Sequence, residues 1–95
     1  METFSALLIP KEVIPSLKFR YREVLDSDFE KQLRSDKLYK AMILGNTHKK
    51  KVSIIFETTD GIRQVETTVW ASVKDDIVLK HGIHIPICCI REVVI

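Results

Sequence analysis

The residues of this sequence whose side chains could bind a ligand include two clusters of basic residues. Clustered ammonium and guanidinium groups bind phosphates and release counterions from nucleic acid. The first cluster follows His48, and the second alternates with Phe19 and Tyr21, whose rings could stack on bases if the segment were a strand. The alternative is a solvated turn for the first cluster and a helix with water-facing charges for the second. The members are Lys49, Lys50 and Lys51 in the first cluster, and Lys18, Arg20 and Arg22 in the second.

Trp70 is a second candidate for binding. The alternation of the surrounding sequence places Trp70, Ile55 and Val78 on strand faces that are otherwise polar. A large aromatic side chain on an outer face either binds a partner or is covered by another segment of the chain. The N-terminal residues are the segment that could cover it. If they leave the face open, we expect a surface for a protein partner or for self-association.

The histidines and cysteines match no known metal-binding pattern. His84 lies four residues before Cys88, but this spacing is not that of a zinc site, and Cys88 and Cys89 would point to opposite faces of a strand. Adjacent cysteines are also poor disulfide partners, so we expect reduced thiols. The chain has no nucleophile elbow and no glycine-rich phosphate loop. We therefore expect no metal, no cofactor and no enzymatic activity.

Length and composition predict one folded domain. The 95 residues are 45% hydrophobic and 29% charged, with a net charge of +2 that does not by itself identify a nucleic-acid-binding protein. No apolar run approaches the roughly 20 residues of a membrane-spanning helix, and the first residues lack the basic start of a signal peptide. We expect an intracellular, cytoplasmic protein that does not engage a membrane.

The elements that must position these residues are mostly strands. Alternation with period two predicts a strand at residues 52–57, a turn at the Asp-Gly pair within residues 58–61, and a long second arm at residues 62–73. A one-turn 3₁₀ segment is expected within residues 87–90. Shorter strands are expected at residues 77–80, 83–86 and 91–95.

The N-terminal half has weaker signals. Ser27 and Glu30 have the spacing of a capping box, which predicts a helix near residues 27–36 with Phe29 and Leu33 on one stripe. Residues 38–44 fit either a helix or a first strand paired with residues 50–58, and we favour the strand. Gly45-Asn46 is expected to end whichever element precedes it. Residues 17–25 fit both helical and strand periodicity.

Short strands joined by tight turns favour a curled antiparallel barrel, because closing the sheet leaves no unpaired edge strands. We expect a mainly β (α+β) single domain over residues 1–95. Residues 1–37 would form an N-terminal extension with the helix, and residues 38–95 a small barrel of four to five strands.

The later strands resemble those of SH3-like and Sm-like small barrels. The resemblance lies in Val65–Ala71, Ile77–Lys80 and the Ile-Pro step within Ile83–Ile87, followed by Ile90. It implies binding of peptides, RNA or partner subunits. The stretch Val65–Ala71 also resembles small bacterial proteins, and this second resemblance does not imply a function. The sequence thus predicts a non-enzymatic interaction or structural domain, with binding of RNA or single-stranded nucleic acid by the two basic clusters as the alternative.

Overall fold

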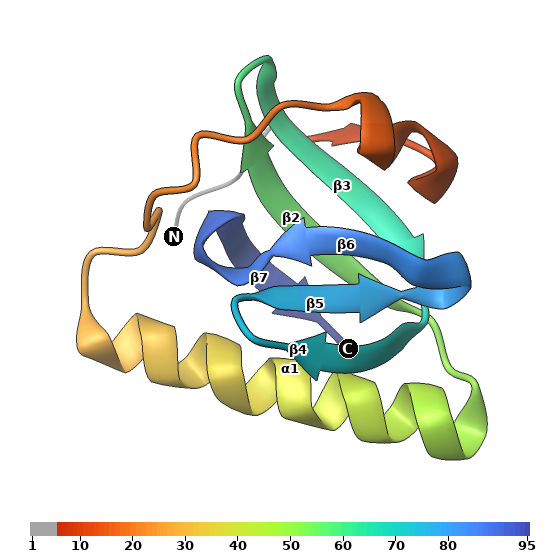
Figure 1. Ribbon diagram of the computed structural model, residues 1–95. Helices are drawn as coiled ribbons and strands as arrows, with labels where there is room; N and C mark the ends of the chain where they lie inside the picture. Colours follow the sequence, from red (N-terminus) through yellow and green to blue (C-terminus); the bar gives the residue numbers. More distant parts are fainter. Residues whose placement is uncertain (1–5) are drawn as a thin grey trace.

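The computed structural model describes residues 6–95, which form two sheets and one long helix, α1 (Asp28–His48) (Figure 1). The larger sheet has the strand order β1-β3-β2-β7, and the smaller has the order β4-β5-β6. All pairings are antiparallel except that of β1 with β3. The strands are β1 (Leu7–Leu8), β2 (Val52–Thr58), β3 (Gly61–Thr67), β4 (Val69–Val73), β5 (Asp76–Leu79), β6 (Ile83–Pro86) and β7 (Ile90–Val94), and the 3₁₀ segments are η1 (Lys11–Ser16), η2 (Lys80–Gly82) and η3 (Ile87–Cys89).

The β2–β3 hairpin forms where the alternation predicts it. Val52, Ile54 and Phe56 are buried, while the residues between them are half-buried. The turn is held by Thr58, whose hydroxyl donates to the carbonyl of Gly61 and accepts from the amide of Asp60. The core lies between the two sheets, because the inward side chains of both are fully buried. Its largest members include Phe56, Ile54, Val65, Ile77, Leu79, Ile85 and Ile90.

The second arm of this hairpin is two strands rather than one. After Thr67 the chain leaves the larger sheet, and β4 begins the smaller sheet at Val69. The carbonyl of Thr68, between the two strands, accepts a hydrogen bond from the amide of Lys80. The register then shifts between Val69 and Ala71. The uninterrupted alternation of the sequence hides this change of sheet.

Residues 38–44 are helical, so the favoured strand is wrong. Arg34, Leu38, Ala41 and Gly45 follow the three-and-four spacing of one helix face, and all are buried. The helix also runs through Gly45 to His48 instead of ending there. A β-carbon at Gly45 would lie 2.3 Å from the carbonyl oxygen of Val69. This glycine therefore lets the helix lie directly against the start of β4 and is not a helix end.

The start of α1 is as predicted, and the stripe of Phe29 and Leu33 is exposed. The hydroxyl of Ser27 accepts from the amide of Glu30 at 3.1 Å and also donates to its carboxylate at 3.1 Å. Within residues 6–95, no helix is long and apolar enough to cross a membrane.

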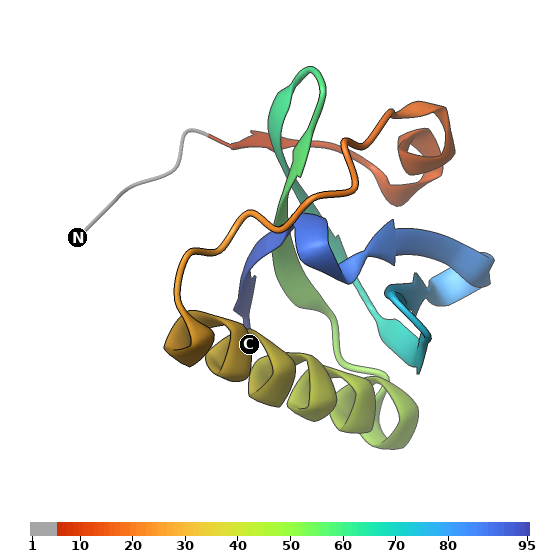
Figure 2. The same ribbon diagram turned by 60° about the vertical axis from the view of Figure 1, so that its left-hand side comes forward.

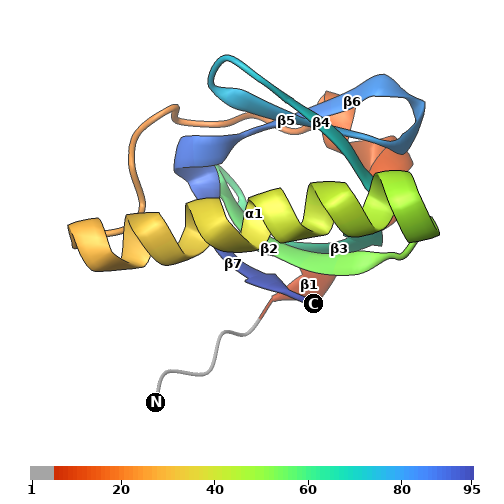
Figure 3. The same cartoon turned by 90° about the horizontal axis from the view of Figure 1, so that it is seen from below.

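The α+β architecture is confirmed, but the two sheets are not closed into a barrel. Helix α1 packs against both β4 and β7, which are edge strands of the two sheets (Figure 3). On the other side, η1 packs against β6 and β3. Helical segments thus cover the openings that strand pairing would cover in a closed barrel.

Residues 17–26 are neither strand nor helix but an extended loop (Figure 2). Its backbone is fixed by hydrogen bonds from the Thr59 amide to the Lys18 carbonyl and from the Val24 amide to the Cys88 carbonyl. Buried Arg34 makes two 2.6 Å hydrogen bonds to the carboxylate of Glu23 and a third to the carbonyl of Ile90. Arg34 therefore fastens the loop to both α1 and β7.

Candidate functional site

A hollow of about 460 Å³ lies where the end of α1 meets β4 and η2, and we name it the basic groove. Its volume is within the roughly 300–1,000 Å³ of small-molecule sites. It is lined by Gly45, Asn46, Lys49, Lys51, Thr68, Trp70 and Lys80. Residues from the first basic cluster and Trp70, which the sequence treats as separate candidates, thus share one site.

The backbone at Lys49 turns the chain from α1 into β2. Lys49 has the left-handed conformation (φ 53°, ψ 34°), and both its amide and that of Lys50 donate to the carbonyl of Leu44. This conformation costs a non-glycine residue about 1–2 kcal/mol. The turn leaves Lys49 and Lys51 lining the groove, while Lys50 is exposed outside its lining.

Trp70 is held at the groove by its backbone and remains accessible. The side-chain amide of Asn46 donates to the Trp70 carbonyl at 3.1 Å, which links β4 to α1. The imidazole of His81 lies edge-on to the indole, with the ring centroids 6.3 Å apart. The residue is 44% exposed. The N-terminal segment therefore does not cover Trp70 within the described part of the chain, and a planar group can reach the indole.

The electrostatic character of the groove is uniform. Lys49, Lys51 and Lys80 line it, and no acidic side chain does. Among the ion pairs between residues 6–95, none includes these three lysines. Three unpaired ammonium groups around an exposed indole favour an anionic ligand with an aromatic part.

The second basic cluster lies elsewhere. Arg20 and Arg22 line another hollow of about 240 Å³, which we name the arginine hollow. It lies beside the β2–β3 turn, whereas the basic groove lies near the start of β2, which is seven residues and hence about 20 Å long. The other residues of its lining are Val24, Glu57, Thr58, Thr59, Gly61 and Cys89. Lys18 is outside this lining, so the predicted six-residue contact surface is divided between two places.

The charges of the arginine hollow are partly neutralised. Glu57 belongs to its lining and forms an ion pair with Arg91. Cys89, which also lines the hollow, is buried, and burial raises the pKa of its thiol to about 11. The thiol is therefore protonated and unreactive at neutral pH.

The predicted partner surface is also divided. Ile55 lies in the larger sheet between Gln64 and Glu92, whereas Trp70 and Val78 belong to the smaller sheet. Ile55 and Val78 are both half-buried. These three residues do not make one apolar patch, because two different sheets carry them.

Cys88 and Cys89 are free thiols with their sulfur atoms 3.9 Å apart, and His84 contacts Asp76. Over residues 6–95, no three histidine, cysteine or acidic residues come together as a metal site.

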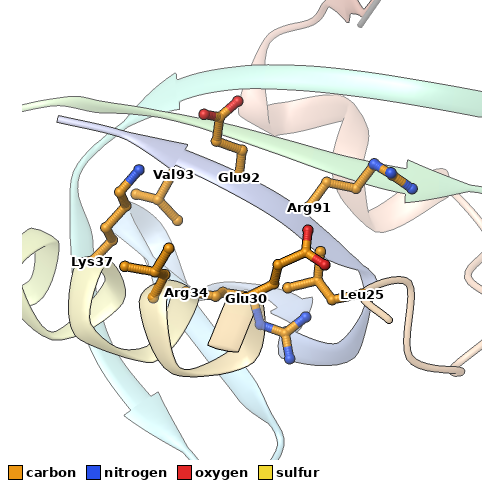
Figure 4. A pocket seen from close by; sticks show the side chains of 8 residues that line it. Leu25, Glu30, Arg34, Lys37, Arg91, Glu92 and Val93 are labelled. Carbon is orange, nitrogen blue, oxygen red and sulfur yellow. The ribbon is translucent and has the colours of Figure 1, made fainter. Parts of the chain in front are cut away.

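A further hollow of about 360 Å³ lies between α1 and β7 (Figure 4). Its lining mixes both signs of charge, with Glu30 and Glu92 among Arg34, Lys37 and Arg91. Arg34 already donates hydrogen bonds to the Glu23 carboxylate and to the Ile90 carbonyl. The hollow is best explained as the charged seam between the helix and the edge strand.

Comparison of the chain with protein-family models, with curated proteins and with solved structures finds no significant match. The candidate site therefore depends on its own geometry. Sequence reasoning missed Lys80 and Asn46, and it considered His81 only as a possible metal ligand. The pairing of Val69 with Leu79 sets Lys80 beside Thr68, so a correct register for β4 and β5 would have found Lys80.

Proposed function

We propose that the protein is a non-enzymatic domain that binds single-stranded nucleic acid in the basic groove. The observation that carries the proposal is the lining of one hollow by half-exposed Trp70 and the unpaired Lys49, Lys51 and Lys80. An unpaired base can stack on the indole while the lysines contact the phosphates on either side. A base inside a duplex could not reach the indole, which favours single strands.

The groove favours binding with little sequence preference. Its polar side chains other than lysine are Asn46 and Thr68. Asn46 already donates to the Trp70 carbonyl. Few hydrogen-bonding groups are left to read base edges, whereas stacking accepts any base.

This function is preferred to a protein-interaction surface around Trp70. That surface needs Ile55 and Val78 beside the indole, but Ile55 is in the other sheet. The side chains that do accompany Trp70 are lysines, which are depleted at the centre of protein interfaces.

The test is a titration of a labelled single-stranded oligonucleotide, followed by fluorescence anisotropy over a range of salt concentrations. The Lys49→Ala, Lys51→Ala, Lys80→Ala triple variant should bind more weakly. Its slope of log K against log salt should be shallower by about 2, from roughly 0.7 per lost phosphate contact.

The matched control replaces Lys18, Lys37 and Lys74, none of which lines the groove, and should keep the slope. Absence of salt-dependent binding to the wild-type protein at low salt contradicts the proposal. Equal losses in the two triple variants would also contradict it, because binding would then reflect overall charge alone.

A further inference from the structure

Helix α1 carries large apolar side chains on the side away from the core. Phe29 is 72% exposed, Tyr39 62%, Ile43 44% and Leu33 43%. At about 100° per residue, Phe29 and Ile43 lie opposite the buried face of the helix, whereas Leu33 and Tyr39 lie on its two flanks, beside β7 and β4 respectively. We name this side the outer α1 face, and it consists of Phe29, Gln32, Leu33, Asp36, Tyr39, Lys40, Ile43 and Thr47. Figure 3, seen from the side of α1, shows no described segment lying across it.

The outer α1 face has apolar side chains toward its two ends and charged side chains, Asp36 and Lys40, at its middle. Phe29, Asp36 and Ile43 form one row, and Leu33 and Lys40 belong to a second row. Because Asp36 and Lys40 have opposite charges and lie one turn apart, the same helix turned end for end is complementary to the middle of this face.

We propose that the outer α1 face binds the same face of a second copy of this chain, with the two helices antiparallel. A two-fold axis beside Leu38 sets Asp36 opposite Lys40 of the second copy, and by symmetry this ion pair forms twice. One turn further out, Leu33 lies opposite Ile43 of the second copy. The centre of the interface is thus charge-complementary and its flanks are apolar.

The ends of the helix favour the same orientation. The first turn of α1 is acidic, with Asp28 and Glu30, and its last turn carries His48. An antiparallel pair brings each acidic end near a basic end and also opposes the two helix dipoles. A parallel pair would bring like charges together. An anionic lipid surface is a poorer occupant, because Asp36 lies at the middle of the face.

The strength expected of this contact is modest. The 21 residues of α1 give a strip about 32 Å long. A single helix strip provides less area than the roughly 800 Å² per partner of a standard stable interface. We therefore expect a reversible dimer with a dissociation constant in the micromolar range. This inference does not depend on nucleic-acid binding, because the basic groove is not part of the outer α1 face.

The experiment is sedimentation equilibrium of wild type, Asp36→Lys and Lys40→Asp over a series of concentrations. Wild type should dimerise, and each single variant should weaken the dimer by about tenfold or more, because each sets like charges opposite one another twice. A mixture of the two variants should form a heterodimer, because both pairs are then attractive. A merely unfolded variant could not produce this recovery.

Ile43→Asp, compared with Val73→Asp at another exposed apolar site, tests the apolar flank. Only the change at Ile43 should reduce dimerisation, with unchanged circular dichroism for both. A wild type that stays monomeric throughout the series overturns the proposal. So does a dimer that neither charge variant weakens, or a mixture of the variants that stays monomeric.

Discussion

The basic groove and the arginine hollow are two basic regions near opposite ends of β2, and they differ in what accompanies the charge. The groove combines three lysines with an exposed indole and no acid. The hollow combines two arginines with Glu57, which is itself paired with Arg91, and has no tryptophan. The surroundings of the basic residues, more than their number, therefore distinguish the proposed nucleic-acid site from a solvated surface.

The two regions are also held in different ways. Close contact between Gly45 and β4 fixes the groove on the rigid elements α1 and β4. The hollow has one wall made by the loop at residues 17–26, which Arg34 fastens through Glu23. Changes at these two anchors should therefore affect one region without the other.

The largest expected effect is that of Arg34→Met, which removes the anchor of the arginine hollow. The free energy of unfolding should fall by about 3 kcal/mol, because the Glu23 carboxylate and the Ile90 carbonyl lose their donor. Urea denaturation measures the loss, and oligonucleotide affinity of the folded variant should stay near that of wild type. A loss below about 1 kcal/mol would show that the ion pair does not hold the loop.

Gly45→Ala should disturb the groove instead. Alanine favours a helix by up to about 1 kcal/mol, but its β-carbon would lie 2.3 Å from the Val69 carbonyl oxygen. We expect a net destabilisation of about 2 kcal/mol as β4 moves, with weaker oligonucleotide binding. Denaturation and anisotropy titrations measure the two effects. A more stable variant would mean that the helix and β4 do not meet this closely.

Lys49→Gly should separate stability from binding. Glycine adopts the left-handed conformation without strain, so the protein should become more stable by about 1 kcal/mol. The same change removes an ammonium group from the groove and should weaken oligonucleotide binding several-fold. Lys49→Ala is the matched control, with the same loss of charge and no gain of stability. Unchanged binding by both variants would remove Lys49 from the site.

Low pH should weaken the attachment of the loop at residues 17–26, because it protonates Glu23. The hydrogen bonds from Arg34 lower the pKa of Glu23 below its usual value near 4.5. Its ionisation therefore stabilises the fold fully above that value, and this contribution is lost as the pH falls through the lowered pKa. We expect less than about 1 kcal/mol, because the carboxylate is partly exposed and Arg34 keeps its bond to Ile90.

Urea denaturation between neutral pH and pH 3 measures this loss, and Glu23→Gln should have a flatter profile than wild type. Identical profiles would contradict the role of Glu23.

The smallest expected effect is that of removing the two arginines of the arginine hollow. Replacing both Arg20 and Arg22 with alanine should change oligonucleotide affinity by no more than about twofold, because these side chains are about one β2 length from the groove. A loss as large as that of the lysine triple variant would mean that one ligand spans both regions.

The strands of the C-terminal half could be predicted, because the alternation that indicates a strand lies within the strand itself. Buried and half-buried residues alternate along the whole of β2, so Val52, Ile54 and Phe56 predict this strand directly. The change of sheet at Thr68 could not be predicted, because alternation continues across it.

Helix α1 was harder to predict from the sequence, because its buried face is partly polar and its exposed face is partly apolar. The buried face includes an arginine and a glycine, Arg34 and Gly45, while Phe29 and Leu33 face outward. Arg34 is buried because of Glu23 and Ile90, and Gly45 because of Val69. Glu23, Ile90 and Val69 all lie outside the helix, so a pattern within the helix does not contain them.

The candidate site could be predicted in its members but not in its assembly. Lys49, Lys51 and Trp70 were identified by type, as a short basic run and a misplaced aromatic residue. Their convergence depends on the length of α1 and on the close approach at Gly45. Separation of Arg20 and Arg22 from them depends on the path of an irregular loop, which has no periodicity to read.

The most direct test of the central claim uses Trp70, the one tryptophan of the chain, as the reporter. Its emission should be quenched when a single-stranded oligonucleotide is added at low salt, because a base stacks on the indole, and the emission should recover as salt is raised. The Arg20→Ala, Arg22→Ala variant should behave like wild type. Oligonucleotide binding by anisotropy without any change in Trp70 emission, or no binding at all, would contradict the account.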